Sequence, residues 1–176
     1  LIAVNRVSFA ILKGNIVAVI GPNGSGKTTL LNLISGLLPL SEGELRFKEQ
    51  KINGLTPHRI ASLGIARTFQ DMRLFGSMSV VENVMVGCHV QTKAGFLGTG
   101  LRLPKAKAEE KGIFEDSLRK LALMGLEDEA FAAPLSLPLG RQKLVSLARA
   151  LATEPDLLLL DEPASGLSVF EAEELS

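Results

Sequence analysis

Residues 21 to 29 combine glycines, a lysine and two threonines at a spacing that suits phosphate binding. The segment reads GPNGSGKTT and matches the pattern GxxxxGK[ST]. Glycines let a loop turn tightly around phosphate oxygens, and a helix that starts at the end of the loop adds its amides and its dipole. The residues expected to bind a nucleoside triphosphate are Gly21, Pro22, Asn23, Gly24, Ser25, Gly26, Lys27, Thr28 and Thr29.

Two side chains of this loop are expected to carry distinct chemistry. The Lys27 ammonium is predicted to bind the β- and γ-phosphates and to act in catalysis, and the Thr28 hydroxyl to ligate Mg²⁺. The apolar run 16–20 is predicted to be a buried strand, and residues 28–35 a helix. The alternative is a glycine-rich turn that happens to carry a lysine. A turn of that kind would not need a strand before it and a helix after it, so the predicted strand and helix argue against this alternative.

A pair of acids follows a second apolar run. Residues 157–160 are four leucines, which predicts a parallel strand buried on both faces, and Asp161 and Glu162 come directly after it. Ligands of open α/β sheets bind at the carboxyl ends of strands. Asp161 is therefore expected to bind Mg²⁺, and Glu162 to act as the general base for the attacking water. An ordinary solvated acidic turn is the alternative, and the upstream loop argues against it.

The order of further motifs resembles the nucleotide-binding domain of ABC transporters over essentially the whole chain. Thr68-Phe69-Gln70 is similar to the Q-loop, residues 137–142 (LPLGRQ) stand where the LSGGQ signature stands, and residues 165–168 (SGLS) are similar to the D-loop. The resemblance implies that Gln70 reaches both Mg²⁺ and the attacking water, and so has a metal-binding and a catalytic role. It also implies nucleotide contacts from Gly140 and Arg141.

The resemblance implies an α/β fold of the phosphate-loop NTPase type. A mostly parallel core sheet, an antiparallel β edge and a helical subdomain over roughly residues 72–152 are expected. ATP and Mg²⁺ are the expected cofactors. Residues 1–176 are interpreted as one nucleotide-binding domain that is truncated at both ends. The aromatic residue that stacks on adenine and the switch histidine of the family are expected outside the chain.

The segment from Arg67 through Phe75 and on to Val84 is similar to the ATP-binding subunits of bacterial importers for branched-chain amino acids. The resemblance implies a head-to-tail dimer with a second ABC ATPase subunit, usually a related, non-identical chain. It also implies membrane permease subunits that contact residues 71–77, and a peripheral location on the cytoplasmic face of the inner or plasma membrane. Two alternatives stay open: a soluble ABC-type ATPase without a membrane partner, and a regulatory nucleotide-binding module with slow turnover.

The signature departs from the family pattern at two positions. Pro138 aligns with the serine whose hydroxyl contacts the γ-phosphate, and Arg141 aligns with the glutamine. Proline has neither an N–H nor a hydroxyl, so one phosphate donor is lost, although proline is well tolerated in the first turn of a helix. Either Arg141 supplies charge to the phosphate, or the site that this signature completes hydrolyses ATP slowly. Ser136 offers a hydroxyl one register away.

The composition excludes several classes of protein. The 19 acidic and 19 basic side chains balance, so nucleic acid is not an expected partner, and one cysteine allows no internal disulfide. No apolar run reaches the roughly 18 residues of a membrane span, so a membrane link is expected through a partner. The remaining predicted elements are strands over 2–11, 43–47, 49–54 and 65–69; helices over 57–63, 80–87, 104–124, 145–152 and 171–175; and a loop over 92–100.

Overall fold

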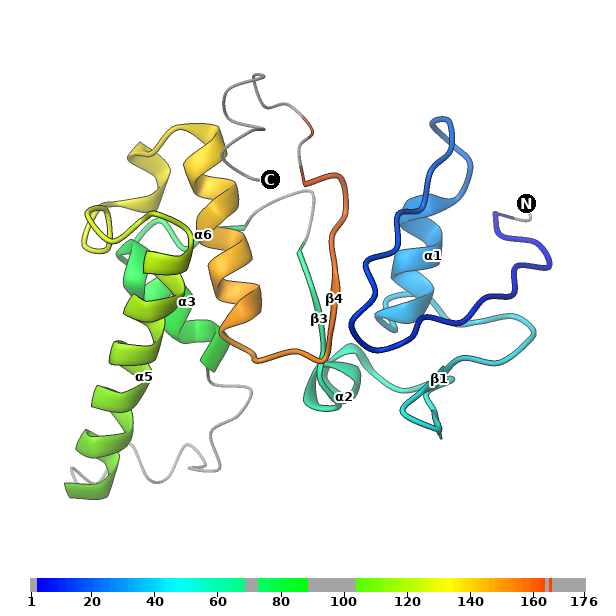
Figure 1. Cartoon of the computed structure of the whole chain (residues 1–176), viewed down its shortest axis with the longest axis horizontal. Helices are drawn as coiled ribbons and strands as arrows, with labels where there is room; N and C mark the ends of the chain where they lie inside the picture. Colours follow the sequence, from blue (N-terminus) through cyan, green and yellow to red (C-terminus); the bar gives the residue numbers. More distant parts are fainter. Residues whose placement is uncertain (1–2, 69–72, 89–103, 164, 166–176) are drawn as a thin grey trace. The chain divides into compact units, whose positions relative to one another are not determined.

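The computed structural model describes residues 3–68, 73–88, 104–163 and 165. The chain divides into two compact units, residues 1–65 and 66–176 (Figure 1). Each unit has its own helices and one pair of strands, β1 with β2 in the first unit and β3 with β4 in the second. Strand β3 begins at Ile65, which is the last residue of the first unit.

The first unit contains two short helices and a β-hairpin. Helix α1 spans Lys27–Ile34 and helix α2 spans Pro57–Ser62. Between them, β1 (Arg46–Phe47) pairs antiparallel with β2 (Gln50–Lys51). The two turn residues of the hairpin have positive φ, 48° and 65°, as a type I′ turn requires. The predicted antiparallel edge is therefore confirmed, with shorter strands than expected.

Side chains and a glycine fix the ends of these elements. The Asn53 side chain accepts from the Leu45 amide at 2.8 Å and donates to the Gly43 carbonyl at 3.1 Å, which closes the hairpin at its base. Gly36 follows helix α1 with φ +71°, and a Cβ there would lie 2.8 Å from the Leu55 carbonyl oxygen. Only glycine fits this position without strain, so the predicted helix end is confirmed.

The predicted strands over 2–11 and 16–20 are wrong. Within the described residues 3–26 no helix or strand is formed, and the Ile16 and Ile20 side chains are almost fully exposed. An apolar run becomes a strand only when neighbouring strands take up its N–H and C=O groups. In the described part of the first unit, the hairpin β1–β2 is the only pairing, and it does not involve this run.

The described part of the second unit contains three α-helices: α3 (Val80–Cys88), α5 (Pro104–Leu123) and α6 (Leu139–Leu151). A single turn of 3₁₀ helix, η1 (Pro134–Ser136), precedes α6. The three helices contact one another pairwise and lie side by side in Figure 1. Their shared apolar core consists of Val80, Val81, Val84, Cys88, Leu121, Leu126, Ala130, Leu144, Val145, Ala148 and Ala152.

Local signals set where these helices begin and end. Ser79 and Glu82 form a capping box at the start of α3: the Ser79 amide and hydroxyl both donate to the Glu82 carboxylate at 2.7 Å. Gly125, with φ +62°, ends α5 as predicted. The sequence predicts helix α6 over 145–152, but the helix begins at Leu139, directly after its N-cap residue Pro138.

Two short strands complete the second unit. β3 (Ile65–Arg67) and β4 (Leu157–Leu159) run in the same direction, and the Thr68 amide donates to the Leu159 carbonyl at 3.0 Å (Figure 1). Both strands agree with the sequence predictions, which place strands over 65–69 and over the apolar run 157–160. The expectation of burial on both faces over 157–160 is only partly correct, since Leu159 is buried and Leu160 is 42% exposed.

Candidate nucleotide-binding site

The predicted phosphate loop forms a tight turn that leads into α1. The Ser25 amide donates to the Pro22 carbonyl at 3.2 Å, and Gly24 and Gly26 have φ values of +80° and +91°. Gly26 is the N-cap residue of α1, and its carbonyl accepts the first helical bond from Leu30 at 2.8 Å. The first amides of a helix have no acceptor within the helix itself. The turn therefore places the positive end of α1 at the end of the loop.

Lys27 folds back over its own loop. Its ammonium donates to the Gly21 carbonyl at 2.8 Å and to the Pro22 carbonyl at 3.0 Å. These bonds hold the positive charge beside the loop and not out in solvent. A fixed cation, a helix N-terminus and a glycine turn together form a site suited to a polyphosphate.

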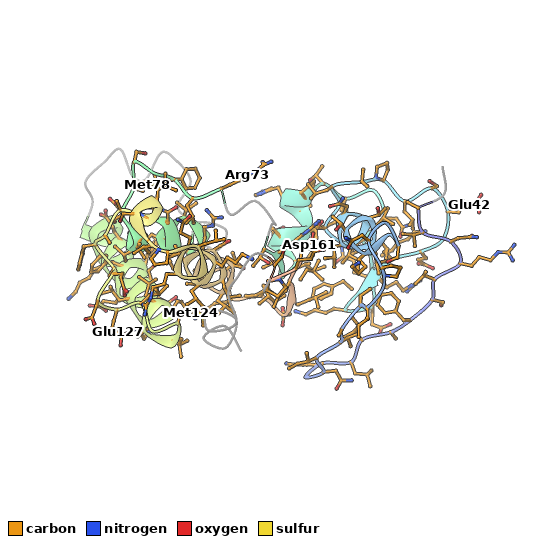
Figure 2. The ribbon with its side chains drawn as sticks, turned by 90° about the horizontal axis from the view of Figure 1, so that it is seen from above. Glu42, Arg73, Met78, Met124, Glu127 and Asp161 are labelled. Carbon is orange, nitrogen blue, oxygen red and sulfur yellow. The ribbon has the colours of Figure 1, made fainter. Side chains whose placement is uncertain are left out.

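The acidic pair combines a buried carboxylate with an exposed one. Asp161, labelled in Figure 2, is buried, and its Oδ2 accepts from Arg67 Nη2 at 2.8 Å. Glu162 is exposed and has a φ of +48°, a left-handed conformation that is unusual for a residue with a Cβ. Strained backbone of this kind clusters at functional sites. The two neighbouring acids thus differ in burial, as two different roles would require.

A lysine of α6 holds the turn that follows these acids. Lys143 Nζ donates to the Pro163 carbonyl at 3.0 Å and also to the Ser165 carbonyl. The Ser165 amide in turn donates to the Glu162 carbonyl at 3.0 Å. The signature helix is therefore connected directly to the acidic turn. Lys143 is not predictable from the sequence, because nothing in its local pattern distinguishes it from a solvated lysine.

The signature segment is ordered by contacts within its own unit. Pro138 is the N-cap residue of α6, and Gln142 returns to it: the Gln142 amide donates to the Pro138 carbonyl at 3.0 Å and its side chain to the Leu137 carbonyl at 2.8 Å. Gly140 is buried in the first turn. Arg141 binds Glu129 at 2.7 Å and the Gly125 carbonyl at 3.0 Å. A phosphate contact from Arg141 would have to compete with these two partners.

The described part of the predicted partner-binding segment, residues 73–77, is attached to two helices. The buried Asn83 of α3 accepts from the Phe75 amide at 2.8 Å and donates to the Phe75 carbonyl at 3.1 Å. From α6, Arg149 donates to the carbonyl of Arg73 at 3.1 Å, and its guanidinium lies 6.0 Å from the Phe75 ring centroid. Leu74 packs against the helical core, whereas Phe75 stays exposed. Figure 2 labels Arg73 at the start of this segment.

The predicted site residues fall into three groups. The phosphate loop belongs to the first unit, and Gly140, Arg141, Asp161 and Glu162 belong to the second. Gln70 lies outside the described residues. Among the described residues, no group of three or more His, Cys, Asp or Glu side chains is placed to hold a metal ion. A carboxylate such as that of Asp161 is a ligand type that suits Mg²⁺, and so is a threonine hydroxyl such as that of Thr28.

No helix in the described part of the chain is both long and apolar enough to span a bilayer.

Comparisons with known proteins agree with the motifs. A family model described as ABC transporter matches residues 4–165. The chain is 38% identical over 175 residues to the high-affinity branched-chain amino acid transport ATP-binding protein LivG of Salmonella typhimurium, covering 99% of this chain and 69% of that protein. It is 37% identical, with the same coverage, to the high-affinity branched-chain amino acid transport ATP-binding protein BraF of Pseudomonas aeruginosa.

Solved structures show the same likeness. MJ1267, an ATP-binding cassette of an ABC transporter, superposes with a TM-score of 0.77 and 32% identity, covering 94% of this chain and 64% of that chain. A dimeric post-hydrolysis state of the cassette MJ0796, bound to ADP and Pi, gives a TM-score of 0.76 and 29% identity over 95% of this chain and 68% of that chain. The chain thus spans roughly two thirds of the length of these relatives.

Proposed function

Since the chain belongs to the ABC transporter family, we propose that it binds and hydrolyses ATP to power an importer of branched-chain amino acids. The predicted family and the α/β phosphate-loop NTPase fold are confirmed. The observation that carries the ATP-binding role is the loop of residues 21–29, with Lys27 held against it at the start of α1. The cargo is taken from the names of the relatives.

In this proposal the loop binds the triphosphate and orients it. The amides at the start of α1 donate to phosphate oxygens, and Lys27 exchanges its two carbonyl partners for the β- and γ-phosphates. The exchange is favourable because a bond from an ammonium to an anionic oxygen is stronger than one to a neutral carbonyl. Thr28, Gln70 and Asp161 are the residues that would hold Mg²⁺, and the ion would supply positive charge that neutralises the phosphates.

Glu162 is the general base in this proposal. Its exposure and its place three residues after the end of β4 suit a carboxylate that accepts a proton from the attacking water. Gln70 assists in orienting that water. A second ABC ATPase subunit completes the site through its signature, and the signature of this chain, with Gly140 and Arg141, does the same for the partner. The dimeric structure of the MJ0796 cassette supports a dimer of such subunits. Membrane permease subunits would hold the assembly on the cytoplasmic face of the membrane.

Two substitutions test the proposal in the full-length protein. Lys27→Ala should abolish MgATP binding in a calorimetric titration, whereas Lys13→Ala, which changes an exposed lysine of the same unit, should not. Glu162→Gln should keep ATP bound and slow hydrolysis by about 10²–10⁴-fold, since a general base contributes that much. Glu127→Gln, at another exposed glutamate, is its control. Unchanged ATP affinity in Lys27→Ala would rule out the ATP site.

The importer role has a separate test. The ATPase rate of the full-length chain is measured alone, with its partner ATPase subunit, and with the permease reconstituted in vesicles together with leucine. Stimulation by the permease and ATP-dependent leucine uptake are expected. A rate that is indifferent to both partners would favour the soluble ATPase, and a negligible rate under all conditions would favour the regulatory module.

A further inference from the structure

A buried ion pair joins the two strands of the second unit. Arg67 follows Ala66 at the end of β3, Asp161 follows β4 by two residues, and the pair is separated by 94 positions in sequence. Arg67 Nη2 lies 2.8 Å from Asp161 Oδ2, and both side chains are only 6% exposed. The bond between the Thr68 amide and the Leu159 carbonyl, at 3.0 Å, fixes the strand register that brings the two charges together.

Stability alone does not account for this pair. Removing two charges from water costs several kcal/mol for each ion, so a buried ion pair is often no more stabilising than apolar side chains of the same volume. Residues 65–69 are otherwise apolar or uncharged, and an apolar side chain at position 67 would suit a buried strand equally well. The reason for an arginine at position 67 must therefore lie in what it does for its partner, the Asp161 carboxylate.

Arginine suits the task of holding a metal-binding carboxylate. Its guanidinium is always charged and donates in fixed directions, so it both balances and orients a buried carboxylate. The bond to Arg67 uses Oδ2 of Asp161, and an ionised carboxylate has about four acceptor positions on its two oxygens. The bond to Arg67 therefore does not by itself exclude a metal ion as a further partner of Asp161.

We propose that Arg67 is a positioning residue that holds the Asp161 carboxylate in the orientation needed to bind the Mg²⁺ of MgATP. This inference rests on the proposed function, in which Asp161 is a ligand of that ion. Arg67 does not touch the nucleotide in this account. It acts through Asp161, in the way that hydrogen-bonding partners of metal ligands commonly set their orientation.

The test measures nucleotide binding and not turnover. The affinity of the full-length protein for ATP is determined by calorimetry in EDTA and over a titration of MgCl₂. Arg67→Met should raise the Mg²⁺ concentration for half-maximal tightening of ATP binding by about 10–100-fold, the usual effect of losing such a partner. Affinity in EDTA should stay the same. Arg67→Lys, which keeps the charge, should give a smaller shift.

Two controls separate positioning from folding. Arg119→Met removes an exposed arginine that pairs with Asp116 at 3.0 Å, and it should leave the Mg²⁺ requirement unchanged. Circular dichroism reports whether each variant folds. If Arg67→Met does not fold, Arg67→Lys decides the question, since it leaves no buried carboxylate without a cation.

Asp161→Asn distinguishes the two ways in which the inference can fail. If Asp161→Asn shifts the Mg²⁺ requirement and neither folded Arg67 variant does, the positioning role is overturned while the metal assignment stands. If Asp161→Asn itself has no effect on that requirement, Asp161 is not a ligand, and the inference falls together with that part of the proposed function. Equal losses of affinity with and without Mg²⁺ in the Arg67 variants would also overturn it, because they indicate a purely structural role.

Discussion

Replacing Gly87 by alanine should destabilise the helical unit, although alanine is the better helix former. Gly87 lies in the last turn of α3, where α3 packs against α6. A Cβ at this position would lie 2.2 Å from the Arg149 carbonyl oxygen and 3.1 Å from the Ala152 methyl group. The oxygen belongs to the backbone of a helix and cannot rotate away, so the two helices must separate.

The size of the effect follows from that contact. Overpacking of a well-packed interface typically costs about 1–3 kcal/mol. The gain in helix propensity from Gly to Ala is at most about 1 kcal/mol and is smaller near a helix end. Gly87→Ala should therefore lower the free energy of unfolding by about 1–2 kcal/mol.

Gly112 provides a matched control within the same unit. It lies inside α5, and a Cβ there would meet nothing within 4 Å. Gly112→Ala should therefore stabilise the unit by about 0.5–1 kcal/mol, since alanine loses less backbone entropy than glycine in a helix interior. The same substitution thus has opposite signs at two helical positions, and the difference is the contact with α6.

Urea unfolding followed by far-ultraviolet circular dichroism is a suitable assay, because the chain has no tryptophan or tyrosine. The helical signal comes mostly from the second unit, where the long helices lie. If Gly87→Ala is as stable as the parent or more stable, the close packing of α3 on α6 at this point is refuted. A destabilised Gly112→Ala would instead show that the helix propensity argument is wrong here.

Three further predictions concern the same unit. Asn83→Ala should cost about 2–3 kcal/mol in urea unfolding, because the N–H and C=O of Phe75 lose their side-chain partner, and a loss below about 0.5 kcal/mol would contradict this. Bonds from the Ser79 amide and hydroxyl lower the pKa of Glu82 from its ordinary 4.5, so its contribution to stability is complete above that pH and is lost as the pH falls through the lowered pKa. The stability difference between the parent and Glu82→Gln should accordingly shrink in unfolding experiments run from pH 6 to pH 3, and a constant difference would refute the argument. Arg141→Ala should cost about 0.5–1 kcal/mol through its half-buried contact with Glu129, and a double-mutant cycle with Glu129→Ala that shows no coupling would contradict that contact.

The parts of this protein that were predictable have short-range causes. The phosphate loop was identified because a turn, a lysine and a helix start lie within nine consecutive residues. The start of α2 at Pro57 and the end of α5 at Gly125 follow from the conformational limits of single residues. The strand β4 is also predictable from local sequence, because a continuous apolar run such as 157–160 is typical of a buried strand. Only residues 157–159 form it.

The sequence predictions are wrong or incomplete where contacts with other residues decide whether a helix or strand forms. The apolar run 16–20 has the composition of a strand, but strand formation requires hydrogen-bonding partners that its own sequence does not specify. Helix α6 begins at Leu139 because Gln142 and Pro138 order its first turn, not because of the apolar periodicity further along. Periodicity therefore located the helix and missed its first residues.

Asp161 and Glu162 show most clearly which features local sequence predicts and which depend on the tertiary structure. Sequence order was sufficient to predict that Asp161 and Glu162 follow a strand, since both features are adjacent in the chain. Only the tertiary structure gave Asp161 its partner Arg67, 94 residues away, and attached the following turn to Lys143 of α6. A charged residue in the otherwise uncharged run 65–69 was the one available signal. Local sequence determines which groups a chain presents, whereas the pairing of buried charges depends on strand register, which forms only when distant segments meet.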